Sequence, residues 1–209
     1  DAILHCYTKE TGYESFFLKG LYQNKNKKKA LINVLSEISI SYLESKNHLP
    51  SIKKIDLVQG NFIENNVVGF SMILFIGEIL HQLLRNENRN EKLYEEILIF
   101  LKEVEAKNNN AHLIFLSKLI KIQGLSPLDN GQEFLNPETG NFSSKISHPY
   151  FTQENSAQWR LLLQEGNYHL PLKKSEKKNL LSSLLIYYHY HQPDFRTPKS
   201  LEVLESVFE

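Results

Sequence analysis

The chain has 209 residues, of which 41% are hydrophobic and 23% charged, so it can bury a core in one large or two small domains. Its formal net charge is zero and Cys6 is its only cysteine. These values exclude a disulfide framework, a cysteine-based zinc site and a partner chosen by overall charge, and they suit a reducing cytoplasm. The longest apolar run, residues 67–80, contains Glu78 and is shorter than the roughly 20 residues of a membrane span, so we expect no membrane segment.

The first part of the chain is expected to form strands. Residues 2–7 and 13–19 are rich in aromatic and branched side chains and flank a turn with Gly12, which predicts a β-hairpin. Residues 32–43 alternate between apolar and polar near their end, and residues 52–59 alternate loosely, which predicts two further strands. Four short strands with a basic loop are typical of a small barrel or of a sheet open on one side.

Residues 19–29, between the second and third predicted strands, contain five lysines and no acidic residue. The first 60 residues hold nine lysines and six acidic residues, a net charge of +3, and the remainder holds fifteen basic and eighteen acidic residues, a net charge of −3. The basic segment is either an ordinary solvated turn or a loop that holds phosphates. A neutral protein with one basic end can still bind a polyanion locally.

Two observations favour the phosphate-holding alternative. Two further lysines lie on the nearby predicted strand 52–59, and aromatic side chains suited to base stacking are within reach at Tyr13, Phe16 and Phe17. The segment has no arginine, which predicts point-charge contact with phosphates, weak sequence preference and steep salt dependence. The predicted DNA-contact residues are Lys19, Lys25, Lys27, Lys28, Lys29, Lys53, Lys54 and Tyr22.

From residue 65 onward the apolar residues recur with a helical period. The predicted helices span residues 66–85, 91–107, 110–123, 153–165, 174–191 and 198–207. Between the third and fourth helices lies a turn-rich segment whose FLNPETGNF core predicts a hairpin, with Pro137 and Gly140 at turn positions. The predicted fold class is therefore α+β, with a strand-rich part before an all-α helical part.

Glu78 and His81 have the Glu-x-x-His spacing of di-iron helical bundles, but the second copy that such sites need does not occur in the sequence. The alternative is a polar strip on a buried helix, continued by Arg85 one turn further on. The sequence also contains no phosphate-binding glycine loop and no nucleophile elbow. We expect no catalytic residue, no cofactor and no metal, and an enzyme that uses Glu78 and His81 with a metal stays as a third alternative.

Three stretches of the chain resemble the RecO family of bacterial recombination mediators, in particular its Bacteroidetes branch. They are LHCYTKETGYESFFLKG (4–20), the helical residues 70–97 with 112–127, and FRTPKSLEVLESVF (195–208). The resemblance implies an N-terminal OB-fold β-barrel in residues 1–62, with its first strand absent from the quoted chain, and a helical domain in residues 63–209. Many relatives carry a four-cysteine zinc module at the place of a hairpin insert at about 128–150. This chain has no cysteine there, so the zinc is not carried over, and we expect the hairpin to hold its place by packing alone.

The resemblance also implies a function. Family members are non-catalytic DNA repair and recombination mediators that bind single-stranded DNA, anneal complementary strands and assist RecA loading onto DNA coated by single-stranded-DNA-binding protein. The implied partners are single-stranded DNA, with double-stranded DNA as a further ligand, RecR, and the C-terminal tail of the single-stranded-DNA-binding protein. RecA is engaged indirectly, and the implied location is the bacterial cytoplasm at the nucleoid.

The acidic tail of that partner would need an apolar pocket with a cationic rim in the helical domain. The predicted partner-binding residues are Phe115, Lys118, Leu119, Lys121 and Lys199. The alternative function is a helical protein-interaction adaptor that does not bind DNA.

Overall fold

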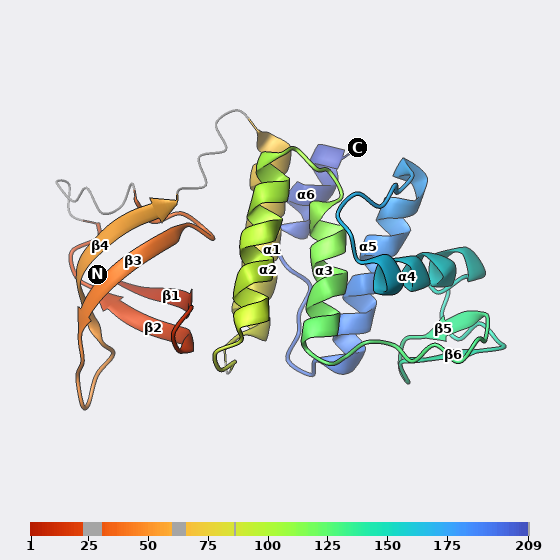
Figure 1. The fold of residues 1–209 in the computed structure, drawn as a ribbon, viewed down its shortest axis with the longest axis horizontal. Coiled ribbons are helices and arrows are strands. Elements are labelled where there is room, and N and C mark those ends of the chain that lie inside the picture. Colours follow the sequence, from red (N-terminus) through yellow and green to blue (C-terminus); the bar gives the residue numbers. More distant parts are fainter. Residues whose placement is uncertain (23–30, 60–65, 86, 209) are drawn as a thin grey trace. The chain divides into compact units, whose positions relative to one another are not determined.

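A computed structural model describes residues 1–22, 31–59, 66–85 and 87–208 of the chain. An N-terminal sheet of strands is followed by helices, which confirms the α+β class (Figure 1). The chain divides into two compact units, residues 1–94 with 199–209 and residues 95–198. The first helix belongs to the same unit as the sheet, whereas the predicted boundary between residues 62 and 63 assigns it to the helical domain.

The sheet of the first unit has the strand order β1-β2-β4-β3. Its strands are β1 (Ala2–Thr8), β2 (Gly12–Leu18), β3 (Glu37–Leu43) and β4 (Ser51–Gln59). The β1–β2 and β3–β4 pairs are antiparallel, and β2 meets β4 in parallel where Phe17 pairs with Ser51. The described strands form an open sheet, so closure into an OB-fold barrel stays a prediction.

One face of this sheet carries the core of the first unit. Phe16, Leu18, Ile52 and Ile55 are buried, and apolar side chains of β1 and β3 pack against them. Successive side chains of a strand point to opposite faces, so burying these four residues fixes which residues face away from the core. The expectation that Phe16 offers a face for base stacking is therefore wrong, because its side chain is fully buried.

A β-bulge interrupts the alternation of β4. Ser41 pairs with Lys54 and Tyr42 pairs with Ile52, so Lys53 is an extra residue on the β4 side of this register. Ile52 and Ile55 are consequently both buried although they are three residues apart, and the two lysines between them are both exposed. The bulge thus gives the outer side of β4 two consecutive cations.

Helix α1 (Val67–Leu83) packs against the C-terminal helix α6 (Leu201–Phe208). The Glu78 carboxylate of α1 accepts hydrogen bonds from the backbone N–H groups of Lys199 and Ser200, both at 3.0 Å, and from the Ser200 hydroxyl at 2.7 Å. Burial alone would raise the pKa of Glu78, but these hydrogen bonds outweigh burial and the pKa is lowered. Glu78 therefore holds the start of α6 rather than forming a polar strip with His81.

The segment after α1 crosses the turn of the β1–β2 hairpin. The Tyr13 N–H donates to the Glu87 carbonyl at 3.1 Å, and the Tyr7 hydroxyl donates to the Asn88 carbonyl at 3.1 Å. Gly12 has φ +90°, and a Cβ at this position would lie 2.5 Å from the carbonyl carbon of Asn88. Only glycine fits both requirements, so Gly12 allows the helix end and the hairpin to meet.

The second unit is helical and carries one small hairpin. Its elements are the C-terminal part of α2 (Glu91–Glu105), α3 (Ala111–Ile122), β5 (Phe134–Asn136), β6 (Asn141–Ser143), α4 (Gln153–Glu165) and α5 (Lys174–His191). Nine residues of α3 are buried, so this helix lies inside the unit rather than packing on one face. The Trp159 ring is also fully buried, and its N–H donates to the Ser183 hydroxyl at 2.9 Å.

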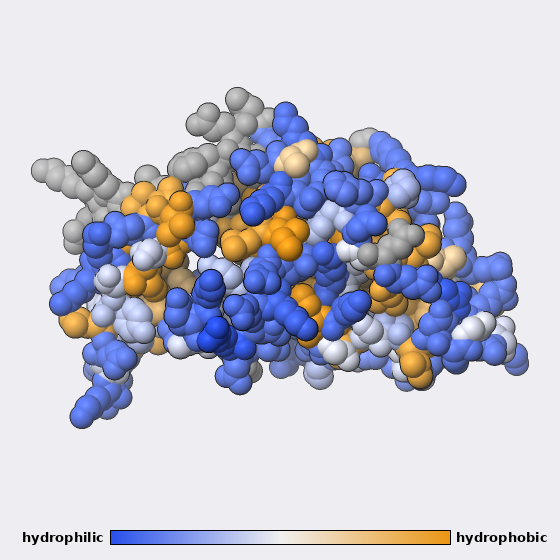
Figure 2. Space-filling view, in the orientation of Figure 1, coloured by the Kyte–Doolittle hydropathy of each residue, from blue (hydrophilic) through white to orange (hydrophobic). Residues whose placement is uncertain are grey.

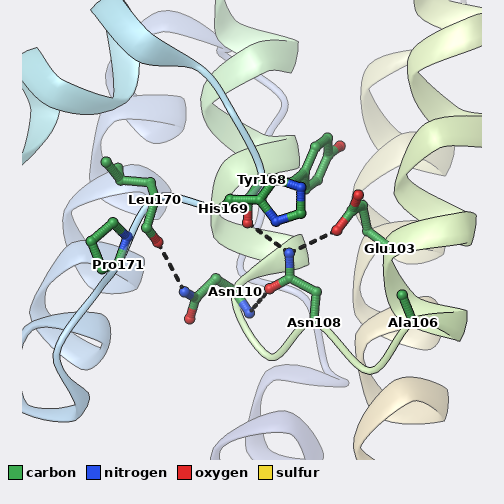
Figure 3. Close-up of a pocket in the computed structure, with 8 residues that line it drawn as sticks. All are labelled: Glu103, Ala106, Asn108, Asn110, Tyr168, His169, Leu170 and Pro171. Atoms are coloured by element: carbon green, nitrogen blue, oxygen red, sulfur yellow. Dashed lines mark hydrogen bonds between the residues drawn. The ribbon is translucent and has the colours of Figure 1, made fainter.

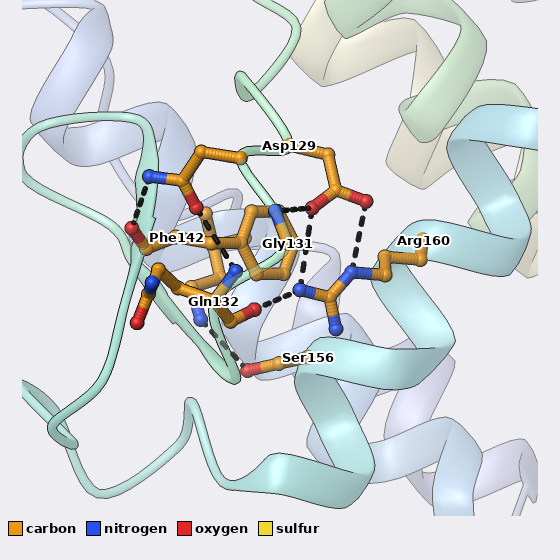
Figure 4. Close-up of polar contacts among 8 residues, drawn as sticks. Asp129, Gly131, Gln132, Phe142, Ser156 and Arg160 are labelled. Carbon is orange, nitrogen blue, oxygen red and sulfur yellow. Dashed lines mark hydrogen bonds and ion pairs between the residues drawn. The ribbon is translucent and has the colours of Figure 1, made fainter.

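Polar contacts from α4 hold the β5–β6 hairpin (Figure 4). The Arg160 guanidinium donates to both carboxylate oxygens of Asp129, at 2.9 and 3.3 Å, and to the Gln132 carbonyl, and it lies 4.0 Å from the centre of the Phe142 ring. The Ser156 hydroxyl accepts a backbone N–H of β5 at 2.9 Å. The expectation that the hairpin holds its place by packing alone is therefore wrong, since a charged network fastens it.

Within the described part of the chain, no helix is long and apolar enough to cross a membrane. On the face drawn in Figure 2, hydrophilic residues predominate and hydrophobic residues gather in separate patches.

Candidate nucleic-acid interface

The sheet face opposite the core is called the outer face here, and it carries Lys54 of β4, because the next residue, Ile55, is buried. Phe16 and Leu18 point into the core, so Tyr13, Ser15 and Phe17 lie on the outer face by alternation. Lys19 follows the end of β2 and is exposed. The outer side of β2 thus runs from an aromatic residue to a cation.

Lys19, just after β2, and Lys53 of β4 both follow the place where the two strands meet. Phe17 of β2 pairs in parallel with Ser51 of β4, and each lysine lies two residues beyond this pair. Tyr22 is 67% exposed, so its ring is accessible to a base. The predicted residues Lys25, Lys27, Lys28 and Lys29 lie outside the described residues.

The charge of Lys54 is partly balanced within the sheet. Its ammonium lies 2.6 Å from the Asp56 carboxylate, and the two side chains are 68% and 55% exposed. An exposed pair of this kind contributes only about 0–1 kcal/mol, so a phosphate can replace the carboxylate as the partner of Lys54.

A second cationic group lies where α1 meets the outer face of β1 and β2. The Arg85 Nη2 lies 3.0 Å from the His81 Nε2, and the His81 Nδ1 lies 3.4 Å from the Tyr13 hydroxyl. The His5 ring packs against His81 with ring centres 4.9 Å apart, and the His5 Nδ1 lies 2.8 Å from the Ser15 hydroxyl. Burial, then the charge of Arg85, then His5 lower the pKa of His81.

Only one half of this second group could be predicted from the sequence. The spacing of His81 and Arg85 on a helix was visible, because residues four apart are neighbours on a helix surface. His5 and Tyr13 join them only through tertiary packing, since Tyr13 and His81 are 68 residues apart in the sequence. The one available signal was that two of the four arginines of the chain, Arg85 and Arg89, fall in the same short segment.

No metal site or reactive thiol stands out in the part of the chain that the structure describes. Its residues contain no group of three or more histidine, cysteine, aspartate or glutamate side chains that could hold a metal ion. Burial, followed by the charge of Glu14, raises the pKa of Cys6 to about 11, so this side chain is a thiol rather than a nucleophilic thiolate at neutral pH.

Two of the predicted partner-binding residues are core residues. Phe115 and Leu119 lie on α3 and are fully buried, and the Phe115 ring packs on Phe100 with ring centres 4.9 Å apart. The expectation that they supply apolar contact to a partner is wrong, because neither side chain reaches the surface.

The three predicted partner-binding lysines differ in their surroundings. The Lys118 ammonium lies 3.0 Å from the Glu96 carboxylate and 4.6 Å from the centre of the Tyr168 ring, so its charge already has a partner. Lys121 and Lys199 are exposed, and their role in partner binding stays a prediction.

A surface pocket of about 290 Å³ lies in the second unit (Figure 3). The Asn108 amide donates to the Glu103 carboxylate at 2.8 Å and to the Tyr168 carbonyl at 2.7 Å, and the Asn110 amide donates to the Leu170 carbonyl at 3.2 Å. These amides fasten the segment before α5 to the turn between α2 and α3. The amide N–H groups of Asn108 and Asn110 are thus engaged in structural contacts, whereas the Asn110 Oδ1 is buried without a hydrogen-bond partner among the described residues.

Exposed cations and aromatic rings on one face of a small sheet form the kind of surface that single-stranded nucleic acids bind, and a helical part accompanies it here. Residues 65–128 match the family model described as "Recombination protein O C terminal". The chain is 28% identical to a DNA repair protein RecO of Flavobacterium psychrophilum over 99% of this chain and 91% of that protein. It is 26% identical to a DNA repair protein RecO of Christiangramia forsetii over 100% of this chain and 92% of that protein. The chain thus resembles DNA repair proteins named RecO over nearly its whole length.

Proposed function

We propose that this protein is a non-catalytic DNA repair mediator that binds single-stranded DNA and anneals complementary strands. It assists RecA loading onto DNA coated by single-stranded-DNA-binding protein. The family relationship supports the role in DNA repair, since the relatives are named DNA repair proteins. The finer activities rest on the outer face and on the lysines of residues 19–29.

The observation that carries the proposal is the pair of exposed lysines on the β4 bulge. Two adjacent lysines on a regular strand would point to opposite faces, and one of them would enter the core. The bulge instead exposes both Lys53 and Lys54, and the exposed Lys19 follows the end of the neighbouring strand β2. Ammonium groups bind phosphates as point charges, which suits a protein that binds DNA of any sequence.

The proposed partners are RecR and the acidic C-terminal tail of the single-stranded-DNA-binding protein, with RecA engaged indirectly. Lys121 and Lys199 are exposed cations that could meet an acidic tail. Because Phe115 and Leu119 are buried, the apolar contacts to such a tail would have to come from other residues.

Strand annealing with and without single-stranded-DNA-binding protein tests the proposal. Complementary oligonucleotides, one with a donor and one with an acceptor fluorophore, report annealing as energy transfer. A mediator accelerates annealing of both bare and coated strands. A protein that binds its partner protein but leaves both annealing rates unchanged would be the adaptor instead.

A further inference from the structure

In the group of His5, Tyr13, His81 and Arg85, an arginine is held against a histidine rather than against a carboxylate. Arg85 and His5 are exposed, and His81 is half-buried between them. Among the described residues no acidic side chain forms an ion pair with Arg85, whose guanidinium is directed to a histidine nitrogen instead. The Arg85 cation therefore lies against a histidine ring with no carboxylate as its ion-pair partner among the described residues.

We infer that this group is a phosphate-binding site that takes the backbone of a single DNA strand and becomes protonated at His81 as it does so. The inference rests on the proposed function, because the ligand is the same strand that the lysines of the outer face would hold. It adds a second point of contact and a dependence on pH, which the lysines alone would not give.

The hydrogen bonds define the two states of the site. A guanidinium only donates, so the His81 Nε2 that faces Arg85 at 3.0 Å must be an unprotonated acceptor, and Nδ1 carries the proton toward Tyr13. When Nε2 gains a proton it can no longer accept from Arg85. The Nε2–H and the guanidinium N–H groups then become adjacent donors, and a phosphate oxygen can accept from both.

The surroundings of His81 favour this exchange. The groups that face it are His5 from β1, Tyr13 from β2 and Arg85 from the turn just after its own helix. Glu78, one turn earlier, is engaged by the start of α6 and does not neutralise the histidine. Burial, Arg85 and His5 lower the pKa of His81 in the absence of a ligand, so a bound anion would raise it and the binding would take up a proton.

The outer side of β2 connects this site with the lysines. Tyr13 and Lys19 are six residues apart, and the intervening outward residues are Ser15 and Phe17. At about 3.3 Å per residue, the two ends of this row lie roughly 20 Å apart. A strand laid along β2 would meet a cation at each end and the half-buried Phe17 ring between them.

The test is the affinity of the whole chain for an oligothymidine at about pH 8 and pH 6, measured by fluorescence anisotropy at low salt. The oligonucleotide carries a 5′-hydroxyl, because a terminal phosphate would itself titrate in this range. We expect the affinity to rise about three- to tenfold toward pH 6, within the tenfold per pH unit that one proton allows. Arg85→Gln and His5→Gln, both at exposed positions, should remove most of this rise.

His48→Gln is the matched control, because His48 is an exposed histidine of the same unit outside the site. It should keep the full rise. An equal rise in all variants, or no rise in the unaltered protein, would overturn the inference while leaving lysine-dependent binding intact. A protein that binds no oligothymidine at either pH would overturn the proposed function together with this inference.

Histidine side-chain NMR provides a readout that does not depend on a variant folding. The pKa of His81 should rise when the oligothymidine is added, and a chelator should not change this. A rise produced by inorganic phosphate but not by the oligonucleotide would contradict the assignment of the site to a DNA strand.

Discussion

Asp56 determines how much of the charge of β4 is available to a phosphate. Its carboxylate holds Lys54 at 2.6 Å on the exposed surface of the strand. Any strand that binds there must displace this carboxylate and approach a fixed negative charge. The effect of Asp56 on DNA binding is therefore opposite in sign to that of the neighbouring lysines.

We predict that Asp56→Asn raises the affinity for single-stranded DNA about two- to fivefold at low salt, and less at high salt because screening weakens the effect. Glu44→Gln removes an equal charge from an exposed position after β3 and controls for net charge. An anisotropy titration of the three proteins measures the difference. Unchanged or weaker binding of Asp56→Asn would place the DNA away from β4.

Gly12 is a residue at which backbone conformation and close contact act together. We predict that Gly12→Ala lowers the local stability of the β1–β2 hairpin by about 2–4 kcal/mol, since alanine is strained at φ +90° and its Cβ would strike the Asn88 backbone. Hydrogen exchange of the hairpin amides measures this loss.

Gly131 separates the two causes, because it has φ +79° with no atom within 4 Å of an added Cβ. Gly131→Ala should cost only about 1 kcal/mol in its own unit. Equal effects of the two substitutions would show that the contact with Asn88 contributes nothing.

At the scale of elements, the β5–β6 hairpin depends on one arginine. We predict that Arg160→Ala lowers the free energy of unfolding by about 1–3 kcal/mol at pH 7, with the ion-pair part at the low end because Asp129 is 39% exposed. The free energy of unfolding of Arg160→Lys should lie between those of the unaltered protein and Arg160→Ala, because lysine keeps the charge but not the bidentate contact with Asp129. Urea unfolding followed by the fluorescence of Trp159 measures the series.

The contact between Arg160 and Asp129 also makes the stability difference between the unaltered protein and Arg160→Ala depend on pH. Hydrogen bonding from Arg160 lowers the pKa of Asp129, so the stabilisation is complete above the ordinary aspartate pKa of about 4 and is lost as pH falls through the lowered value. The gap between the unaltered protein and Arg160→Ala should therefore narrow in acid. A gap that stays constant down to the acid limit would mean that the ion pair contributes little.

The sequence predicted most elements to within a few residues, and the departures have local causes. The third strand was expected from residue 32 but β3 begins at Glu37, because Leu35 adopts φ 57° in a turn. The last helix was expected from residue 198 but begins at Leu201, since the two preceding N–H groups bind Glu78. A bulge leaves no trace in the residue types, so the exposure of both lysines on β4 could not be derived from alternation.

The candidate site was only partly predictable, because residue types predict exposure but not tertiary contacts. Lysines are exposed almost wherever they occur, so Lys19, Lys53 and Lys54 could be named from the sequence alone. The burial of Phe115 and Leu119 was not predicted, because Lys118 and Lys121 give α3 the sequence pattern of a surface helix. Lys118 lies at the edge of the core instead, since the Glu96 carboxylate pairs with it there. The His5–His81 contact depends on how β1 packs against α1, which no local pattern encodes.

At the scale of the whole molecule, the formal net charge is zero, yet the first 60 residues carry a net charge of +3. At an ionic strength of 0.15 M a charge acts over about 8 Å, so a strand bound at the outer face responds to nearby lysines rather than to the sum over the chain. A neutral protein can therefore bind a polyanion strongly at low salt and lose it steeply as salt rises.

The salt dependence of single-stranded DNA binding tests this account most directly. With about four phosphate contacts, the logarithm of the binding constant should fall against the logarithm of the salt concentration with a slope near −3. Reversing Lys53 and Lys54 to glutamate should weaken binding at low salt and reduce the slope by about 1.4. Reversing Lys27 and Lys28 should have the same effect. As a control, Lys102→Glu with Lys107→Glu in the second unit should change neither the affinity nor the slope. An unaltered affinity and slope after both reversals in the first unit would contradict the assignment of the DNA-binding surface to this unit.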